Sequence, residues 1–393
     1  MPAYPPALPP ALTRKHGVRG VLFTVIVAVA LVVGAVILAL VFVVSGRPQA
    51  IAVGFVLALL PVAPLVLCFL WLDRYEPEPV RLLVLSFFWG AVAATSAALA
   101  LQSVDQLVGL SDDIVSGAVV APFTEEATKG VFVLLLLWFR RNVINGVLDG
   151  LVYAGLVGVG FAFTENILYF ASAYTGGPDS GPGGLGAATG LFVLRGIFSP
   201  FAHPLFTSAI GIGVGLAVTT RRPVVRVAAP AVGYLVAVAL HATWNGSAFL
   251  AGGQFFVLTY LFAMVPGFLL LVGIAVWVRH REGATLARAL DDLAYRGYLD
   301  PSEVPWLARL PARRTARRNA ALRGGPTFER LLREYQQQAI ELAALHDRVM
   351  RGNPPQDSHH RGALMAQRLA ALRAHLMLPQ LPTGASSRRG GWA

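Results

Sequence analysis

The chain has 393 residues, of which 55% are hydrophobic and 13% are charged. This balance excludes an ordinary soluble domain, in which about 25% of residues are charged, and indicates a protein that crosses a membrane several times. The net charge of +11 comes mostly from arginines, many of them after residue 280. No compact basic motif with stacking aromatic residues accompanies them, so we expect contact with the lipid bilayer and no nucleic-acid partner. The single cysteine, Cys68, excludes a disulfide within the chain and a thiolate metal site.

Eight apolar segments follow one another along the chain after residues 1–19, which are rich in Pro and Ala, basic at their end, and expected to be disordered. The first segment is about 24 residues long, too long for the apolar core of a cleaved signal peptide, so we expect a retained anchor. Each segment is long enough to span a bilayer. The predicted spans are 20–44, 51–72, 82–102, 114–139, 145–173, 191–219, 228–250 and 254–278. The sequence therefore predicts an all-α, polytopic membrane protein with about eight transmembrane helices.

Basic residues fall on alternate connections between these spans. The basic connections hold Arg14, Lys15, Arg19, Arg74, Arg81, Arg140, Arg141, Arg221, Arg222, Arg226, Arg279 and Arg281. The opposite connections hold Arg47 and otherwise Asp105, Asp112, Asp113 and Asp179. By the positive-inside rule, both termini of this multi-pass protein are predicted to be cytoplasmic, and we expect it in the plasma membrane.

The last part of the chain, residues 280–393, has a different character. Helical spacing of apolar residues recurs over 285–298, 327–350 and 363–378, which predicts a basic, helical, cytoplasmic tail. One apolar stripe comprises Phe328, Leu331, Tyr335, Leu342, Leu345 and Val349. The histidines of the tail, His346 among them, show no ligand spacing and are expected on the surface. The predicted regions are therefore a basic N-terminus (1–19), a membrane domain (20–279) with its catalytic helices within 114–250, and the tail (280–393).

Two adjacent carboxylates, Glu125 and Glu126, lie with Lys129 inside the fourth predicted span. A charge at such depth costs roughly 2.5–3.5 kcal/mol on insertion scales, so these groups need partners. Lys129 is four residues after Glu125 and three after Glu126, and it can pair with either on one helix. The remaining partners must come from other spans.

Glu165, His203 and His241 are the matching polar residues of three later spans. Counted from the outer helix ends at about 1.5 Å per residue, these three and Glu125 lie roughly 12–18 Å deep, in one layer of the outer half of the bilayer. Pro200 and Pro204 flank His203, and prolines at such positions free backbone carbonyls that a polar cavity can satisfy. We therefore expect one buried polar chamber.

A hydrolase site is the first of three interpretations of this chamber. Two histidines and one glutamate form a known ligand set for catalytic zinc, which here predicts His203, His241 and Glu165 as ligands. Glu125 or Glu126 would then be the general base for a water molecule. Without a metal, a glutamate could still take the water proton while histidine and Asn245 stabilise the oxyanion.

The second interpretation is a proton- or cation-coupled transporter that uses the same Glu/His cluster, and the third is a scaffold whose buried charges fix helix packing. Transporters usually show internal repeats, and the sequence has no convincing repeat. Other membrane proteases are excluded, because the chain has no His-Glu-x-x-His run, no Gly-x-Ser-x-Gly elbow and no pair of membrane aspartates.

The order of the polar motifs resembles that of the PrsW family of membrane proteases, part of a wider group with the CAAX prenyl endopeptidases and bacteriocin-immunity proteases. The motifs are Glu125-Glu126-x-x-Lys129, Asp149-Gly150-x-x-Tyr153, Gly160 to Tyr169 around Glu165-Asn166, Arg195, His203-x-x-x-Thr207 and His241-x-x-Trp244-Asn245. The resemblance implies an intramembrane endopeptidase with a Glu/His site, classed as a metalloprotease. It also implies membrane-anchored protein substrates, such as anti-sigma factors, cut on the outer side.

Overall fold

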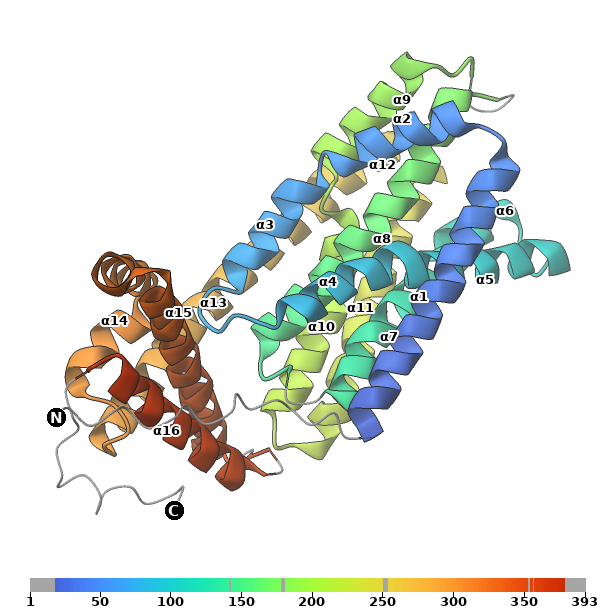
Figure 1. The fold of residues 1–393 in the computed structure, drawn as a ribbon. Coiled ribbons are helices and arrows are strands. Elements are labelled where there is room, and N and C mark those ends of the chain that lie inside the picture. The colour runs from blue at the N-terminus through green and yellow to red at the C-terminus, as the bar shows by residue number, and fades with distance from the viewer. Residues whose placement is uncertain are drawn as a thin grey trace. The chain divides into compact units, whose positions relative to one another are not determined.

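The computed structural model describes residues 18–140, 143–177, 181–249, 254–352, 354–355 and 357–378. Within these ranges the chain is helical and forms no strand beyond one isolated bridge between Gly177 and Gly181 (Figure 1). The predicted all-α class is confirmed. The predicted disordered N-terminus up to residue 17, and Arg141 and Asp179 of the orientation argument, lie outside the described residues.

The described residues form two compact units. One comprises residues 18–73 and 78–276, and the other comprises 74–77 and 277–378. We call them the membrane unit and the C-terminal unit, and each is described by itself.

Seven helical stretches are long and apolar enough to cross a membrane. They are Val18–Ser45, Pro48–Leu72, Val80–Val108, Val147–Thr175, Leu185–Thr219, Pro223–Phe249 and Gln254–Tyr295. The remaining predicted span, 114–139, is also helical, formed by α6 (Asp113–Val115), η2 (Ser116–Val120) and α7 (Ala121–Phe139). Glu125, Glu126 and Lys129 near its middle make it less apolar than the seven stretches above. The seven stretches with this helix between them account for the eight predicted spans.

Several spans consist of more than one helical element. Pro48–Leu72 is α2 (Pro48–Leu59) and α3 (Val62–Leu72), and Val80–Val108 is α4 (Val80–Phe88), η1 (Trp89–Ala94) and α5 (Thr95–Val108). Leu185–Thr219 is α9 (Leu185–Phe192), η3 (Val193–Phe198) and α10 (Ala202–Thr219), and the last span is α12 (Gln254–Thr259), η5 (Tyr260–Met264) and α13 (Val265–Tyr295). The elements η1, η2, η3 and η5 are π-helical. This geometry is rare in proteins overall, and where it occurs it is often at a functional site.

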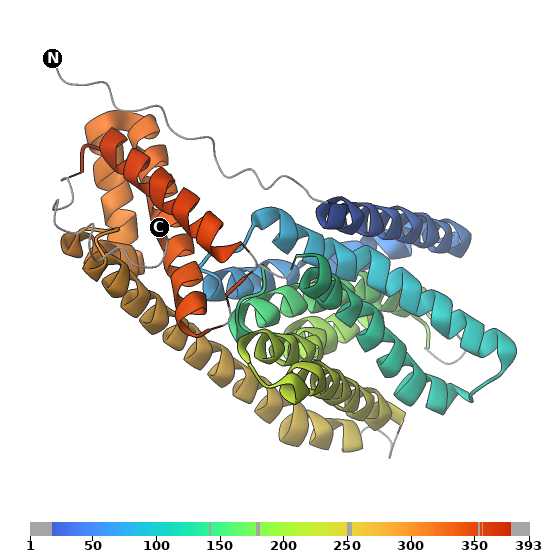
Figure 2. The same ribbon diagram turned by 90° about the horizontal axis from the view of Figure 1, so that it is seen from below.

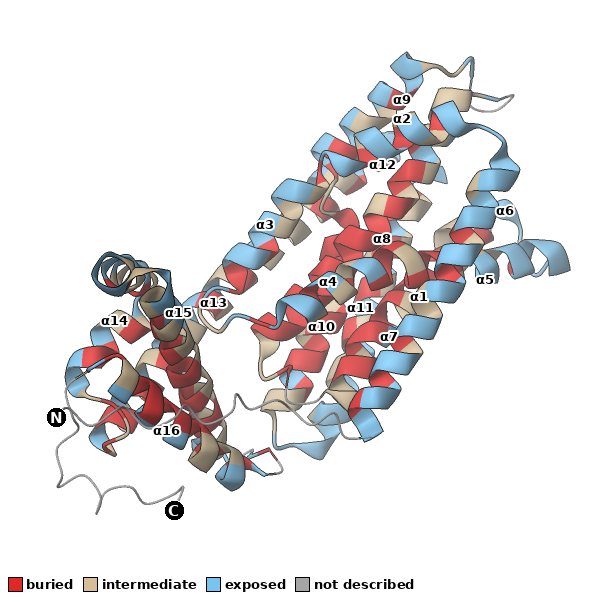
Figure 3. Cartoon of the chain, in the orientation of Figure 1, coloured by how far each residue is buried: buried red, intermediate tan, exposed pale blue. Residues whose placement is uncertain are grey.

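The helix α8 (Val147–Thr175) forms the centre of the membrane unit, and most of its length is buried (Figure 3). The helix α1 (Val18–Ser45), by contrast, lies at the edge of the bundle in both views (Figures 1 and 2). Glycines allow the close packing of α8. A Cβ added at Gly160 would lie 1.9 Å from the carbonyl oxygen of Phe87, and one at Gly150 would lie 2.1 Å from that of Gly211. These small faces bring α4 and α10 to backbone contact with α8.

The C-terminal unit contains the end of α13 and three later helices, α14 (Val304–Ala308), α15 (Leu310–Met350) and α16 (Ser358–His375). Its core includes Tyr335, Leu342 and Leu345, with Phe328, Leu331 and Val349 packed against it, which confirms the predicted stripe. The loop 74–77 belongs to this unit, because Arg313 donates from Nη1 to the carbonyl oxygen of Tyr75 at 2.9 Å. One prediction was wrong: His346 is buried, because its Nε2 pairs with Asp292 on α13.

Candidate functional site

The helix α7 carries Glu125, Glu126 and Lys129 into the interior of the membrane unit, where all three are buried. Lys129 Nζ lies 2.8 Å from Oε1 of Glu126 and 3.4 Å from Oε2 of Glu125. The predicted pairing along one helix is therefore confirmed. Trp89 of η1 donates from Nε1 to the carbonyl oxygen of Thr128 at 3.0 Å and so ties α7 to the neighbouring span at this level.

Glu126 connects three helices. Its Oε1 lies 3.0 Å from Nδ1 of His241 on α11 (Pro223–Phe249), in addition to the contact with Lys129. Its Oε2 accepts a hydrogen bond of 3.0 Å from Oγ1 of Thr207 on α10. Both carboxylate oxygens are thus engaged, and the side chain is fully inaccessible to solvent.

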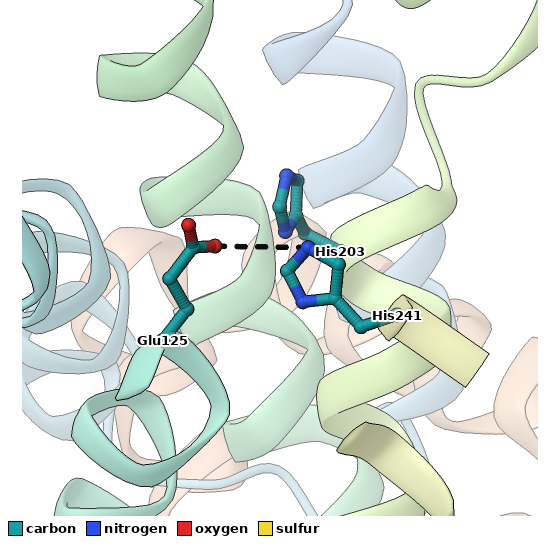
Figure 4. A group of neighbouring side chains, drawn as sticks. All are labelled: Glu125, His203 and His241. Carbon is teal, nitrogen blue, oxygen red and sulfur yellow. Dashed lines mark ion pairs between the residues drawn. The ribbon is translucent and has the colours of Figure 1, made fainter. Parts of the chain in front are cut away.

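Glu125 is held less tightly. Its Oε1 accepts a hydrogen bond of 3.2 Å from Nε2 of Gln102 on α5, a residue that the sequence analysis missed. Its Oε2 lies 3.7 Å from Nε2 of His241. Figure 4 shows the Glu125 carboxylate facing the two imidazoles, which come from α10 and α11. Both adjacent glutamates therefore contact Lys129 and His241.

Glu165 on α8 pairs with His203 and Arg195. His203 Nε2 lies 2.7 Å from Oε2 of Glu165, and the guanidinium of Arg195, on η3, forms an ion pair with the same oxygen. Arg195 also donates from Nε to Oδ1 of Asn166 at 2.8 Å, and its guanidinium lies 4.0 Å from the ring centroid of Tyr169. His203 and Arg195 together hold the Glu165 carboxylate in place.

The contacts of His203 define its tautomer. Lys129 Nζ lies 2.9 Å from Nδ1 of His203. An ammonium group has donors and no acceptor, so Nδ1 must accept this hydrogen bond. The ring proton is then on Nε2 and is donated to Glu165. Lys129 thus fixes the direction in which His203 donates.

Glu125, His203 and His241 together could hold a metal ion, because one donor atom from each lies within 4.8 Å of the others. Two imidazoles and a carboxylate are a common donor set for catalytic zinc, which binds such atoms at about 2.0–2.2 Å. The donor types fit, and the group is buried as such a site requires. The carboxylate in this group is Glu125. The expectation that Glu165 is the third ligand stays a prediction, and in this arrangement Glu165 pairs with Arg195 and His203.

Other residues of the predicted motifs lie away from the cluster. Asn245 donates from Nδ2 to the carbonyl oxygen of Gly117 at 3.1 Å and so ties α11 to η2, and its predicted orienting role stays a prediction. Tyr153 donates to Oε2 of Glu78 at 2.7 Å, at the start of the third span. The prediction that Glu125, Glu165, His203 and His241 meet at one level agrees with the contacts described above.

The fold and the cluster define a multi-pass helical membrane protein with carboxylates and imidazoles from four helices gathered in its interior. The family model described as PrsW family intramembrane metalloprotease matches residues 78–271, which include every residue of the cluster. Over these residues, just under half of its length, the chain is similar to the PrsW family.

Two relatives were found among characterised proteins. The Protease PrsW of Clostridioides difficile (strain 630) is 30% identical over 122 residues, which are 30% of this chain and 51% of that protein. The Protease PrsW of Bacillus subtilis (strain 168) is 34% identical over 98 residues, which are 25% of this chain and 44% of that protein. The chain spans about half the length of the relatives it matches. No solved structure matches it significantly.

Proposed function

We propose that the protein is an intramembrane endopeptidase that hydrolyses peptide bonds of membrane-anchored proteins with an activated water molecule. The observation that carries the proposal is the buried cluster of Glu125, His203 and His241, to which Glu126 and Glu165 are joined by direct contacts. The family and the names of the relatives support the same activity.

Glu125 has the central role in the metal-independent form of this mechanism. Glu126 is held on both oxygens by short contacts, and Glu165 is clamped by Arg195 and His203. The contacts of Glu125 are longer, from 3.2 to 3.7 Å. Its carboxylate is therefore the one with room to take a proton from water.

In the metal-dependent form, Glu125, His203 and His241 would hold a zinc ion. A bound zinc would supply Lewis-acid polarisation of the water and of the substrate carbonyl. Glu165 is then the candidate base, because its side chain is 15% exposed whereas that of Glu126 is inaccessible. Arg195 keeps this carboxylate in place beside His203.

The substrate class follows from the place of the site. A chamber inside a helical bundle admits a peptide segment that is itself in the membrane, so we propose membrane-anchored proteins, such as anti-sigma factors, as substrates. We place the cluster in the outer half of the plasma membrane with both termini in the cytoplasm, on the strength of the basic connections. The surrounding lipid bilayer is the other partner.

The test combines metal content with proteolysis. The full-length protein is purified in detergent, its zinc is measured by elemental analysis, and new N-termini are mapped in membranes that contain the wild-type or the Glu125→Gln protein. Glu329→Gln is the matched control, because Glu329 lies in the C-terminal unit. We expect membrane-protein cleavages that vanish with Glu125→Gln and persist with Glu329→Gln. Cleavage that survives the combined Glu125→Ala, Glu126→Ala and His203→Ala changes would refute the site.

A further inference from the structure

Lys129 contacts two of the three candidate ligands, Glu125 and His203, and it also contacts Glu126. Its side chain is completely buried. The ammonium also lies 3.8 Å from the ring centroid of Phe161, a cation–π distance. The centre of the cluster therefore contains a buried positive charge.

The ammonium contacts two atoms that a metal ion at this site would also use. It lies 2.9 Å from Nδ1 of His203 and 3.4 Å from Oε2 of Glu125. A zinc ion lies about 2.0–2.2 Å from nitrogen and oxygen ligands. Nδ1 has a single lone pair, which accepts from Lys129, so a metal ion can bind this atom only when the ammonium has left it.

Charge balance points the same way. With Glu125, Glu126 and Glu165 ionised, the three negative charges meet two positive charges, from Lys129 and Arg195, which leaves a net charge of −1. A divalent ion added to this group would reverse the sign to +1. Without the charge of Lys129 the group has −2, which a divalent ion balances. At distances of a few ångströms in a buried site, such a difference changes affinity strongly.

We infer that Lys129 is a built-in counter-cation that competes with a divalent metal for Glu125 and His203 and so lowers the metal affinity of the cluster. This inference rests on the metal-dependent form of the proposed function. Lys129 has a long, flexible side chain, and its contact with Glu126 at 2.8 Å lets it stay paired when the ammonium leaves the two ligands.

Arg195 provides the matched control. It has the same formal charge but is paired with Glu165, which is outside the Glu125, His203 and His241 group. If Lys129 acted through long-range electrostatics alone, removal of either cation would raise metal affinity to a similar extent. Direct competition predicts a clearly larger effect at Lys129.

The experiment measures metal affinity and needs no substrate. The metal-free, full-length protein is titrated with Zn²⁺ against a chelator, and with Co²⁺ whose visible absorption reports the ligand set. We expect Lys129→Met to bind Zn²⁺ about tenfold or more tightly than wild type. Lys129→Arg keeps the charge and should stay near wild type, and Arg195→Met should gain less than Lys129→Met. Thermal unfolding checks that each variant is folded, and Lys129→Gln replaces any Lys129→Met protein that is not.

An unchanged or weaker Zn²⁺ affinity in both Lys129→Met and Lys129→Gln would overturn the inference. So would an equal gain in Arg195→Met. The proposed function fails differently. If the neutral variants bind metal more tightly but the wild type cleaves no membrane protein, competition stands and the protease proposal falls. If the wild type cleaves and the neutral variants gain no affinity, the protease proposal stands and competition falls.

Discussion

Gln102 of α5 donates a hydrogen bond from Nε2 to Oε1 of Glu125 on α7, across 3.2 Å. The bond uses the carboxylate oxygen that does not face His241 and leaves Oε2 directed at the histidines. Gln102, which belongs to a span outside the predicted motifs, thus orients the Glu125 carboxylate. That carboxylate is the base in the metal-independent form of the mechanism and a ligand in the metal-dependent form. Gln102 is a positioning residue.

Gln102→Leu removes this hydrogen bond with little change in size. We expect kcat to fall about 10- to 100-fold with a smaller change in KM, as is typical when the partner that orients a catalytic or ligating group is lost. Gln102→Glu places a carboxylate beside Glu125 and should not restore the rate, whereas Gln102→Asn should recover part of it. Gln106→Leu is the control, because Gln106 is exposed one turn further along α5. An equal loss in both leucine variants would show a general effect on α5.

Close packing of α8 makes a second prediction. A Cβ at Gly160 would lie 1.9 Å from the carbonyl oxygen of Phe87, so Gly160→Ala must push α8 and α4 apart. We expect a loss of about 1–3 kcal/mol in unfolding free energy, seen as a lower thermal midpoint of the detergent-solubilised protein. Gly273→Ala in α13 is the control, since a Cβ there meets nothing within 4 Å. It should be neutral or gain up to about 1 kcal/mol through helix propensity. A stable Gly160→Ala protein would contradict the packing seen here.

The sequence predicted the spans well because long apolar runs leave few alternatives in a membrane. It also predicted that Glu125, Glu165, His203 and His241 meet, because buried charges need partners and the list of candidates was short. The first prediction used the length of single apolar runs, and the second used depth along single helices. Neither required knowledge of which helix faces which.

The contacts that the sequence analysis did not predict depend on which helices face one another. Gln102 is one amide near the end of a predicted span, and only the approach of α5 to α7 brings it to Glu125. That Glu125 lies beside the two histidines in the candidate metal group depends on the rotation of α7 about its axis. His346 looked like a surface residue because its partner, Asp292, is more than fifty positions away in the sequence.

Asp73 supports a prediction about pH. It lies one residue beyond the span Pro48–Leu72 and accepts hydrogen bonds from the backbone N–H of Glu78. Burial raises the pKa of Asp73 from 3.8 to about 7, and the charge of Asp149 adds to this, although the Glu78 N–H opposes it. The folded protein therefore binds this proton more tightly than the unfolded chain does. The stability that Asp73 contributes is complete below pH 3.8 and is lost as the pH rises through about 7.

The thermal midpoint of the wild type should accordingly fall between pH 5 and pH 8, and Asp73→Asn should fall less over the same range. Asn keeps a carbonyl oxygen that can accept from Glu78 and removes the charge. Asp113→Asn, at an exposed aspartate of α6, should follow the wild type. If Asp73→Asn shows the full wild-type pH dependence, the group responsible lies elsewhere.

The C-terminal unit offers a comparison of a buried with an exposed ion pair. Arg373 of α16 lies with Nη1 2.7 Å from Oε2 of Glu303, and both side chains are less than 8% exposed. Arg333 pairs with Glu329 at the same distance, but its side chain is 61% exposed. Removing one partner of a buried pair leaves an uncompensated charge and costs about 3–5 kcal/mol, whereas an exposed pair is worth about 0–1 kcal/mol. Arg373→Met should therefore speed hydrogen exchange across α15 and α16 of the full-length protein, and Arg333→Met should leave it unchanged. Similar exchange in the two variants would mean that the Glu303 pair does not hold this unit together.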